Sequence, residues 1–324
     1  MNADPLTVVM YHYVRPIVGS AYPGVNGLEV EDFRGQLDFV QKYYTPISAA
    51  DLVAAQRGET ELPKRPILLS FDDGFKDHIE HVAPALIERG VSGAFYPPSC
   101  AVLERRMLDV HKIHHILAVV SDKDALIAEL EGRMIGRDGV RPLQDYRAEC
   151  WKASRWDPAE VRYFKRLLQS ALQQPLRSEL CSILFRKYVS TDEADFADSF
   201  YLSLEDLQRL VDAGMHVGSH GHEHVHLEHT SVQQQAADLD RSLQMLARVD
   251  SGNSWFSFCF PHGSYNADTL SLLKERGCAF ALTSRVGLAK VGSTEVLQLT
   301  RIDTNDLPRH GDAEPGPWTS KLLQ

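Results

Sequence analysis

The sequence predicts an α/β fold built on a mostly parallel sheet. Short runs rich in apolar β-branched and aromatic residues alternate along the chain with stretches of helical periodicity. Several of these runs are apolar at nearly every position, as expected for strands that are covered on both faces. With 324 residues, 44% of them hydrophobic, the chain can form one large domain with a substantial core. We therefore expect an α/β barrel or a doubly wound sheet.

The individual elements follow from these runs. Strands are expected in the runs LTVVMYHYV, PILLSF, SGAFYP, MHVGS, WFSFCF, FALTS and LQLTRI, which begin at Leu6, Pro66, Ser92, Met215, Trp255, Phe280 and Leu297. A helix is expected where Phe33, Leu37 and Val40 recur at helical spacing. Two further helices are expected to end at Gly90 and Gly214, because glycine is a common helix stop.

One region, from about residue 101 to 200, contains no convincing strand but several helical segments. No linker rich in Pro, Gly or Ser flanks it, which favours a helical insertion within a single catalytic domain over residues 1–324. A small separate domain is the alternative. Three histidines of the insertion, His111, His114 and His115, are expected on a solvated helix face. The proline-containing tail, residues 308–324, is expected to be irregular.

Composition excludes several classes of protein. The net charge of −10 gives no electrostatic footprint for nucleic acid, and no apolar run is long enough to cross a bilayer.

The amino-terminal stretch MNADPLTVVMYHYV lacks the pattern of a signal peptide, so we expect a cytoplasmic protein. The five cysteines are odd in number and contain no C-x-x-C pair, which predicts free, mostly buried thiols. The sequence does not set the oligomeric state.

An acidic pair follows the run that begins at Pro66. In the stretch LLSFDDGF, Asp72 and Asp73 stand before Gly74, which permits a sharp turn. Active sites of α/β barrels lie at the carboxyl ends of the strands. Two adjacent carboxylates there can take different roles, one as a cation ligand and one as a general base whose pKa the cation lowers. A surface Asp-Asp-Gly turn is the alternative.

Four histidines occupy alternate positions in the stretch GSHGHEHVH, which runs from Gly218 to His226. In a strand, this alternation would place all four on one face. In a helical turn that begins near Ser219, His220 and His224 would point the same way because they are four residues apart. Two histidines and one carboxylate form a three-ligand site with room for water, which is typical of hydrolytic zinc.

A solvated loop is the alternative for this stretch, because six histidines between His216 and His229 make chance pairs easy to find. Three of them, His222, His226 and His229, are surplus to a single metal site and are expected at the surface. A third motif, FCFPHGSYN, predicts a turn at Pro261 to Gly263 whose backbone N–H groups could point into a site.

Taken together, SFDDG, SHGHEH and FPHGSYN, with the opening VVMYHYV, resemble the motifs of the polysaccharide deacetylases. This is the NodB-homology group, carbohydrate esterase family four. The resemblance covers residues 6–100 and 203–303 and leaves the helical insertion outside the common core. It implies a distorted (β/α) barrel that removes acyl groups from sugars with a divalent metal.

The resemblance also implies roles for individual residues. Asp72 would be the general base, and the metal ligands would be Asp73, His220 and His224, which favours the helical pairing of the two histidines. The backbone N–H of His262 would stabilise the oxyanion. Two further residues of the third motif, Gly263 and Tyr265, are expected to contact the substrate.

Two features of the family are missing. The Arg that usually orients the base in the third motif is replaced by Cys259, and the late Leu-x-His motif that supplies the general acid has no equivalent. We hypothesise that Arg301 holds Asp72 in place of the missing Arg. His12 is the first candidate for the acid and His262 the second, whereas a packed core histidine is the alternative interpretation of His12.

The sequence thus favours a metal-dependent hydrolase that removes an N-acyl group, acetyl or formyl, from a sugar. A sugar nucleotide or a lipid-linked sugar of surface polysaccharide or lipopolysaccharide synthesis would suit a cytoplasmic enzyme. Zinc fits the ligands best, although cobalt, nickel, iron or manganese could bind them too. An inactive carbohydrate-binding relative of the deacetylases is the main alternative, and a metal-buffering protein is a weaker one.

Overall fold

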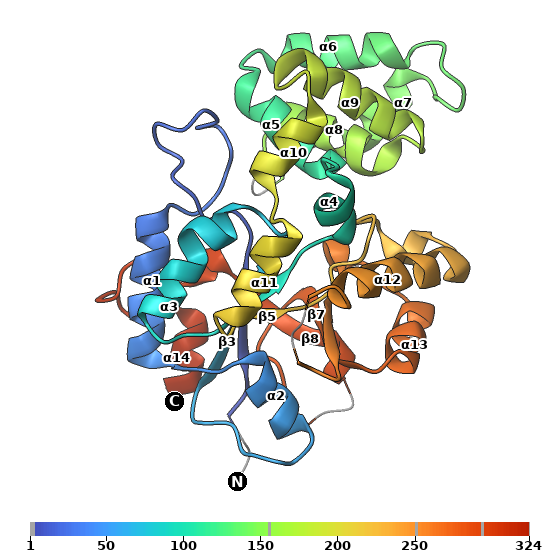
Figure 1. Cartoon of the computed structure of the whole chain (residues 1–324). Coiled ribbons are helices and arrows are strands. Elements are labelled where there is room, and N and C mark those ends of the chain that lie inside the picture. Colours follow the sequence, from blue (N-terminus) through green and yellow to red (C-terminus); the bar gives the residue numbers. More distant parts are fainter. Residues whose placement is uncertain (1–3, 155–156, 250–251, 293–294, 324) are drawn as a thin grey trace. The chain divides into compact units, whose positions relative to one another are not determined.

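The structure is a computed structural model that describes residues 4–154, 157–249, 252–292 and 295–323. The chain forms two compact units. Unit 1 comprises Met1–Pro16, Gly27–Arg105 and Asp198–Gln324, and unit 2 comprises Ile17–Asn26 and Arg106–Ala197. Figure 1 shows the elements of both units in the colours of the sequence. Unit 2 therefore takes in most of the segment expected as an insertion, together with a short segment near the amino terminus.

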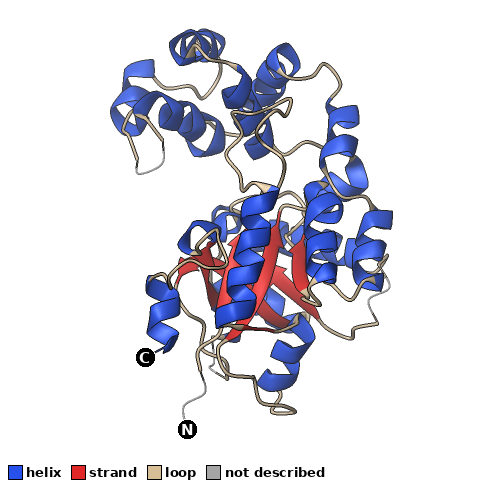
Figure 2. Cartoon of the chain, turned by 90° about the vertical axis from the view of Figure 1, so that its left-hand side faces the viewer, coloured by secondary structure: helices blue, strands red, loops and turns tan. Residues whose placement is uncertain are grey.

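Unit 1 is a curled parallel sheet surrounded by helices, which confirms the predicted α/β class and the distorted barrel (Figure 2). The strand order is β5-β4-β3-β1-β8-β7-β6, with β2 beside β3, and the pairings between these strands are parallel. A parallel bridge between Ser219 and Phe258 joins the two ends of this order. The strands are β1 (Thr7–Tyr11), β2 (Thr45–Pro46), β3 (Pro66–Asp72), β4 (Gly93–Tyr96), β5 (His216–Val217), β6 (Phe256–Cys259), β7 (Cys278–Val286) and β8 (Leu299–Asp303).

Each of the strand runs taken from the sequence overlaps one of these strands, and the short β2 is the addition. The helices of unit 1 are α1 (Val30–Tyr43), α2 (Ala49–Gln56), α3 (Ala83–Glu88), α4 (Ser99–Glu104), α11 (Leu204–Asp212), α12 (Val232–Leu246), α13 (Ala267–Glu275) and α14 (Pro317–Leu323). The helix stops at Gly90 and Gly214 are confirmed, since both residues have left-handed backbones, with φ of 63° and 80°. The expectation of an irregular tail is wrong for α14, which begins at Pro317, a residue type well suited to a first helical turn.

The alternation of side chains along β3 decides which of them face the barrel interior. Leu69 and Phe71 belong to the core between the sheet and the helices, whereas Leu68 belongs to the second core, inside the barrel. Because strand residues two apart share a face, Ser70 and Asp72 point the same way as Leu68. A polar serine and a carboxylate are thereby placed at the carboxyl end of the barrel interior.

Among the described residues of unit 2, the regular secondary structure is helical, as predicted for this region, and the segment Ile17–Asn26 is a loop. Its helices are α5 (Asp109–Val119), α6 (Lys123–Met134), α7 (Leu143–Cys150), α8 (Ala159–Arg166), α9 (Leu176–Tyr188) and the first part of α10 (Glu193–Phe200). The expected solvated histidine face is wrong for His111 and His115, which are 1% and 0% exposed. The His115 ring packs edge-on against Tyr22 and Phe196, so this helix face lies inside the unit.

The cysteines are free, and four of them are buried, as predicted. None of the helices formed by the described residues combines the length and the apolar character that crossing a bilayer requires.

Candidate active site

The acidic pair forms a tight turn at the carboxyl end of β3. Asp72 is the last residue of that strand, and the next two residues, Asp73 and Gly74, have left-handed backbones with φ of 70° and 66°. A Cβ atom on Gly74 would lie 2.5 Å from Cβ of Pro97, so the turn requires glycine. Because of this turn, the side chains of Asp72 and Asp73 point in different directions.

Asp73, His220 and His224 come together, although they lie far apart in the sequence. Each offers one ligand atom, and these atoms lie within 4.8 Å of one another. Oδ1 of Asp73 is 3.4 Å from Nε2 of His220 and 3.2 Å from Nε2 of His224. Tetrahedral zinc with bonds of about 2.0–2.1 Å holds neighbouring ligand atoms about 3.3 Å apart. The three side chains therefore fit a single divalent cation.

The orientation of the His220 ring is set by a backbone carbonyl. Its Nδ1 lies 2.7 Å from the carbonyl oxygen of Cys259. Because a carbonyl only accepts hydrogen bonds, Nδ1 carries the proton, and the lone pair of Nε2 faces Asp73. Ligand histidines of metal sites are held in this way.

The loop that carries the two histidines is not helical, so the expected helical turn near Ser219 is wrong. Left-handed residues at Gly221 and His224, with φ of 70° and 53°, fold the chain back and bring the two imidazoles together. Asp238 of α12 holds the loop, because its carboxylate accepts the N–H groups of His222 and Glu223 at 2.9 and 2.7 Å.

Replacing Asp238 with alanine should loosen this loop. Two N–H groups would lose their acceptor, which costs about 1–3 kcal/mol of unfolding free energy for each group that stays buried. We expect metal affinity to fall by roughly 10–100-fold, as it does when residues that support ligands are removed. A metal titration with a competing chelator measures the change, and Asp240→Ala on the exposed side of the same helix is the matched control.

The surplus histidines do not share one environment. The surface interpretation is wrong for His222, which is 1% exposed, because its Nδ1 lies 2.8 Å from Oγ of Ser99 and its Nε2 lies 3.1 Å from a carboxylate oxygen of Glu104. His226 is half-buried and stacks on the ring of His262 at a centroid distance of 4.1 Å. His229 is exposed, as expected.

Asp72 forms a buried ion pair with Arg301 of β8. Its oxygens lie 2.9 and 2.8 Å from the two terminal guanidinium nitrogens, and both side chains are 2% exposed. Arg301 is itself held by the Thr283 carbonyl, 2.7 Å from its Nε, and by the Ser70 hydroxyl, 3.2 Å from its Nη1. Burial raises the pKa of the Asp72 carboxyl, but the charge and hydrogen bonds of Arg301, together with the charges of His220 and His12, outweigh this effect, and the net pKa is lowered. Asp72 is therefore ionised at neutral pH.

A second possible ligand group, Asp72, His220 and Cys259, shares one histidine with the first. It is the poorer cation site for two reasons. The Arg301 guanidinium already pairs with both Asp72 oxygens. Burial raises the pKa of the Cys259 thiol, which disfavours the thiolate that binds metals.

His12 follows β1 and lies beside Asp72. Its Nε2 is 3.9 Å from Oδ2 of Asp72, and its side chain is 43% exposed. The exposure rules out the alternative of a packed core histidine, although its neighbours Tyr11 and Tyr13 are buried.

The third motif forms the predicted turn, as a 3-10 helix over Pro261–Gly263 with a left-handed backbone at His262, φ 56°. The His262 ring lies 4.5 Å from the ring of His224, although the residue itself is exposed at the surface. The crowding of its ring by neighbouring side chains, then the charges of His224 and His226, lower its pKa. A Cβ on Gly263 would meet Oγ of Ser284 at 1.8 Å, so this glycine allows close packing.

Tyr265 lies in the same loop, but its side chain contacts residues other than Asp73, His220 and His224. Its ring stacks on Phe260 at a centroid distance of 4.4 Å, and its hydroxyl donates a hydrogen bond to Gln298 at 3.0 Å.

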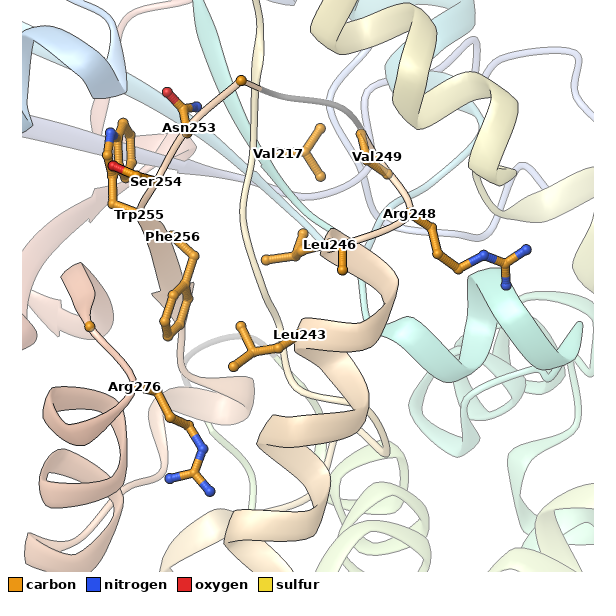
Figure 3. A pocket seen from close by; sticks show the side chains of 13 residues that line it. Val217, Leu243, Leu246, Arg248, Val249, Asn253, Ser254, Trp255, Phe256 and Arg276 are labelled. Carbon is orange, nitrogen blue, oxygen red and sulfur yellow. The ribbon is translucent and has the colours of Figure 1, made fainter.

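A cavity of about 530 Å³ lies elsewhere on unit 1 (Figure 3). Leu243 and Leu246 of α12 line it together with Phe256 and Gly277, which stand at the amino-terminal ends of β6 and β7. The ligand group follows the carboxyl ends of the strands, so this cavity is not part of the candidate site.

Comparisons with known proteins agree with the motifs. The family model described as polysaccharide deacetylase matches residues 188–281, which include His220, His224 and His262. The structure is similar to that of Streptococcus pyogenes deacetylase PplD in complex with acetate, with a TM-score of 0.58, 15% identity, and coverage of 100% of this chain and 98% of the other. The resemblance to the polysaccharide deacetylases is confirmed.

Two other solved structures share the deacetylase fold. IcaB from Ammonifex degensii has a TM-score of 0.56 and 17% identity, covering 99% of this chain and 97% of the other. A de-N-acetylase from Aggregatibacter actinomycetemcomitans has a TM-score of 0.54 and 12% identity, covering 99% and 100%. Among curated protein sequences, none matches the chain significantly.

Relative to the deacetylase motifs, sequence reasoning missed the residues that support the site. Asp238 holds the loop that carries the two histidines. Ser70 holds Arg301, and the Cys259 carbonyl holds His220. Ser70 could have been found, because it stands two residues before Asp72 on the same strand face. Asp238 left no local signal, since it reaches the loop from the middle of a helix.

Proposed function

We propose that the chain is a metal-dependent hydrolase that removes an N-acyl group from a sugar. The observation that carries the proposal is the ligand group of Asp73, His220 and His224 beside the buried pair of Asp72 and Arg301. A cation site and a spare ionised carboxylate supply activation of the water and of the acyl carbonyl, two of the functions that metal-assisted hydrolysis of an amide uses. The acetate bound to the similar streptococcal deacetylase is the product expected when the acyl group is acetyl.

Zinc is the proposed metal, because two imidazoles and one carboxylate leave a fourth position open. Cobalt, nickel, iron or manganese are alternatives with the same ligand types. A divalent cation held there lowers the pKa of a water molecule and polarises an acyl carbonyl.

Asp72 is proposed as the general base that takes the proton of the attacking water. Arg301 holds both of its oxygens and keeps the carboxylate ionised and oriented. Arg301 thereby does the work of the Arg that Cys259 replaces in the third motif. The backbone N–H of His262 is proposed to stabilise the oxyanion, with Gly263 shaping that turn and Tyr265 contacting the sugar.

The departing amine needs a proton, because an amide anion cannot leave unaided. His12 is proposed as the donor, since it is half-exposed at the end of β1 and lies 3.9 Å from Asp72. His262 is the poorer candidate, because its ring is held by two other rings: it stacks on His226 and meets His224 edge-on.

The proposal is tested with purified protein and a panel of N-acetylated and N-formylated sugar nucleotides and lipid-linked sugars. We expect the release of acetate or formate from at least one substrate, loss of this activity with a chelator, and recovery with Zn²⁺. If metal is bound and none of the substrates is hydrolysed, the inactive carbohydrate-binding relative becomes the better description.

A further inference from the structure

His78 contacts the backbone of His12, the proposed general acid, and takes no part in the chemistry described above. It is 0% exposed and begins a π-helical turn, η1 (His78–Val82), which precedes α3. Its ring is surrounded by the rings of Phe71, Phe75 and Phe95 at centroid distances of 5.7, 5.5 and 5.7 Å. π-Helical turns are rare and occur frequently at functional sites.

The ring of His78 makes one directed contact from this aromatic environment. Its Nε2 lies 2.9 Å from the carbonyl oxygen of His12. The pairing of β1 with β3 ends at Tyr11. The contact with His78 therefore holds the next residue of the chain, His12. Burial lowers the pKa of His78 to about 4, and the neutral ring donates from Nε2, because a carbonyl only accepts.

Two more contacts attach the same segment to the turn. Nε of Arg15 lies 2.6 Å from a carboxylate oxygen of Asp77, and both side chains are largely buried. The Tyr13 ring stacks on Phe75 at a centroid distance of 4.2 Å. Residues 12, 13 and 15 are thus each held by a residue of the short stretch that follows the acidic pair.

We propose that His78 is a positioning residue that fixes the backbone of His12 and thereby aims the His12 ring at the departing amine. The inference rests on the proposed function, in which His12 donates the proton. Residues 72–78 would then carry the base, one metal ligand and the support of the acid. A displacement of about 1 Å of a catalytic group can cost 10²-fold in rate, so such support matters.

The test is a double-mutant cycle on kcat. We expect His78→Leu to lower kcat by roughly 10–100-fold, with bound metal and KM little changed. His78→Gln keeps an N–H donor and should recover much of the loss. In a His12→Ala background, His78→Leu should change kcat by no more than about twofold, because the group that it positions is already gone.

His216→Leu is the matched control. His216 is also a buried histidine whose pKa is lowered to about 4, but it hydrogen-bonds Ser257 at 2.7 Å and lies at β5. We expect its replacement to leave kcat unchanged.

The outcomes separate the inference from the proposed function. Equal losses from His78→Leu in both backgrounds, or no loss in the wild type, would overturn the positioning role, while His12→Ala without effect would overturn the acid. Should the wild type hydrolyse nothing, amide hydrogen exchange of residues 12–15 still decides. Faster exchange there in His78→Leu than in His216→Leu supports the contact, and unchanged exchange rejects it.

Discussion

Replacing Asp72 with asparagine is expected to lower kcat by roughly 10²–10⁴-fold, the usual contribution of a general base. Asparagine keeps the shape of the side chain but cannot take the proton of the attacking water. The bound metal should stay at one equivalent per chain, because Asp72 pairs with Arg301 and is not one of the proposed ligands. Acetate or formate release and elemental analysis of the same preparation measure the two effects.

Asp73→Asn is the matched control for this experiment, since it changes the neighbouring carboxylate in the same way. We expect it to lower the metal content together with the activity. A normal kcat in Asp72→Asn, or a loss of its metal, would contradict the division of roles between the two aspartates.

Replacing Arg301 with methionine is expected to lower the free energy of unfolding by about 3–5 kcal/mol, as happens when one partner of a buried ion pair is removed. The Asp72 carboxylate would remain 2% exposed without its cation. Urea unfolding followed by circular dichroism measures the change. The double variant Asp72→Asn with Arg301→Met should recover part of the loss, because no unpaired charge is left in the barrel.

Arg285→Met is the control for the second experiment. Arg285 stands on the neighbouring strand β7, is exposed, and donates a hydrogen bond to the Gln298 carbonyl at 2.9 Å. Its replacement should change the unfolding free energy by no more than about 0.5 kcal/mol. Equal stability of Arg301→Met and the wild type would show that the pair is not the buried support described here.

The sequence was sufficient to predict the strands and the order of the motifs, because both depend on local patterns. Buried parallel strands are apolar at nearly every position, and glycine marks the turn after Asp73 and the helix stop at Gly90. The motifs also predicted which histidines meet Asp73, although they gave the wrong local geometry. A spacing of four residues fits a helical turn, but Gly221 and His224 produce the same pairing through left-handed backbones.

The remaining errors come from contacts with distant parts of the chain. His222 alternates with His220 and His224, and the pattern could not show that Ser99 would bind its ring. The pattern also could not show that Tyr22, which stands more than ninety residues earlier in the chain, would pack against the His115 ring. Such partners depend on tertiary packing, which local periodicity does not encode.

Anomalous diffraction at the zinc edge, from crystals of the protein grown with Zn²⁺, tests the central claim most directly. The account predicts one strong peak at about 2.0–2.2 Å from Oδ1 of Asp73 and from Nε2 of His220 and His224. Absence of a peak there, or a peak held by His226 and His229 instead, would contradict it.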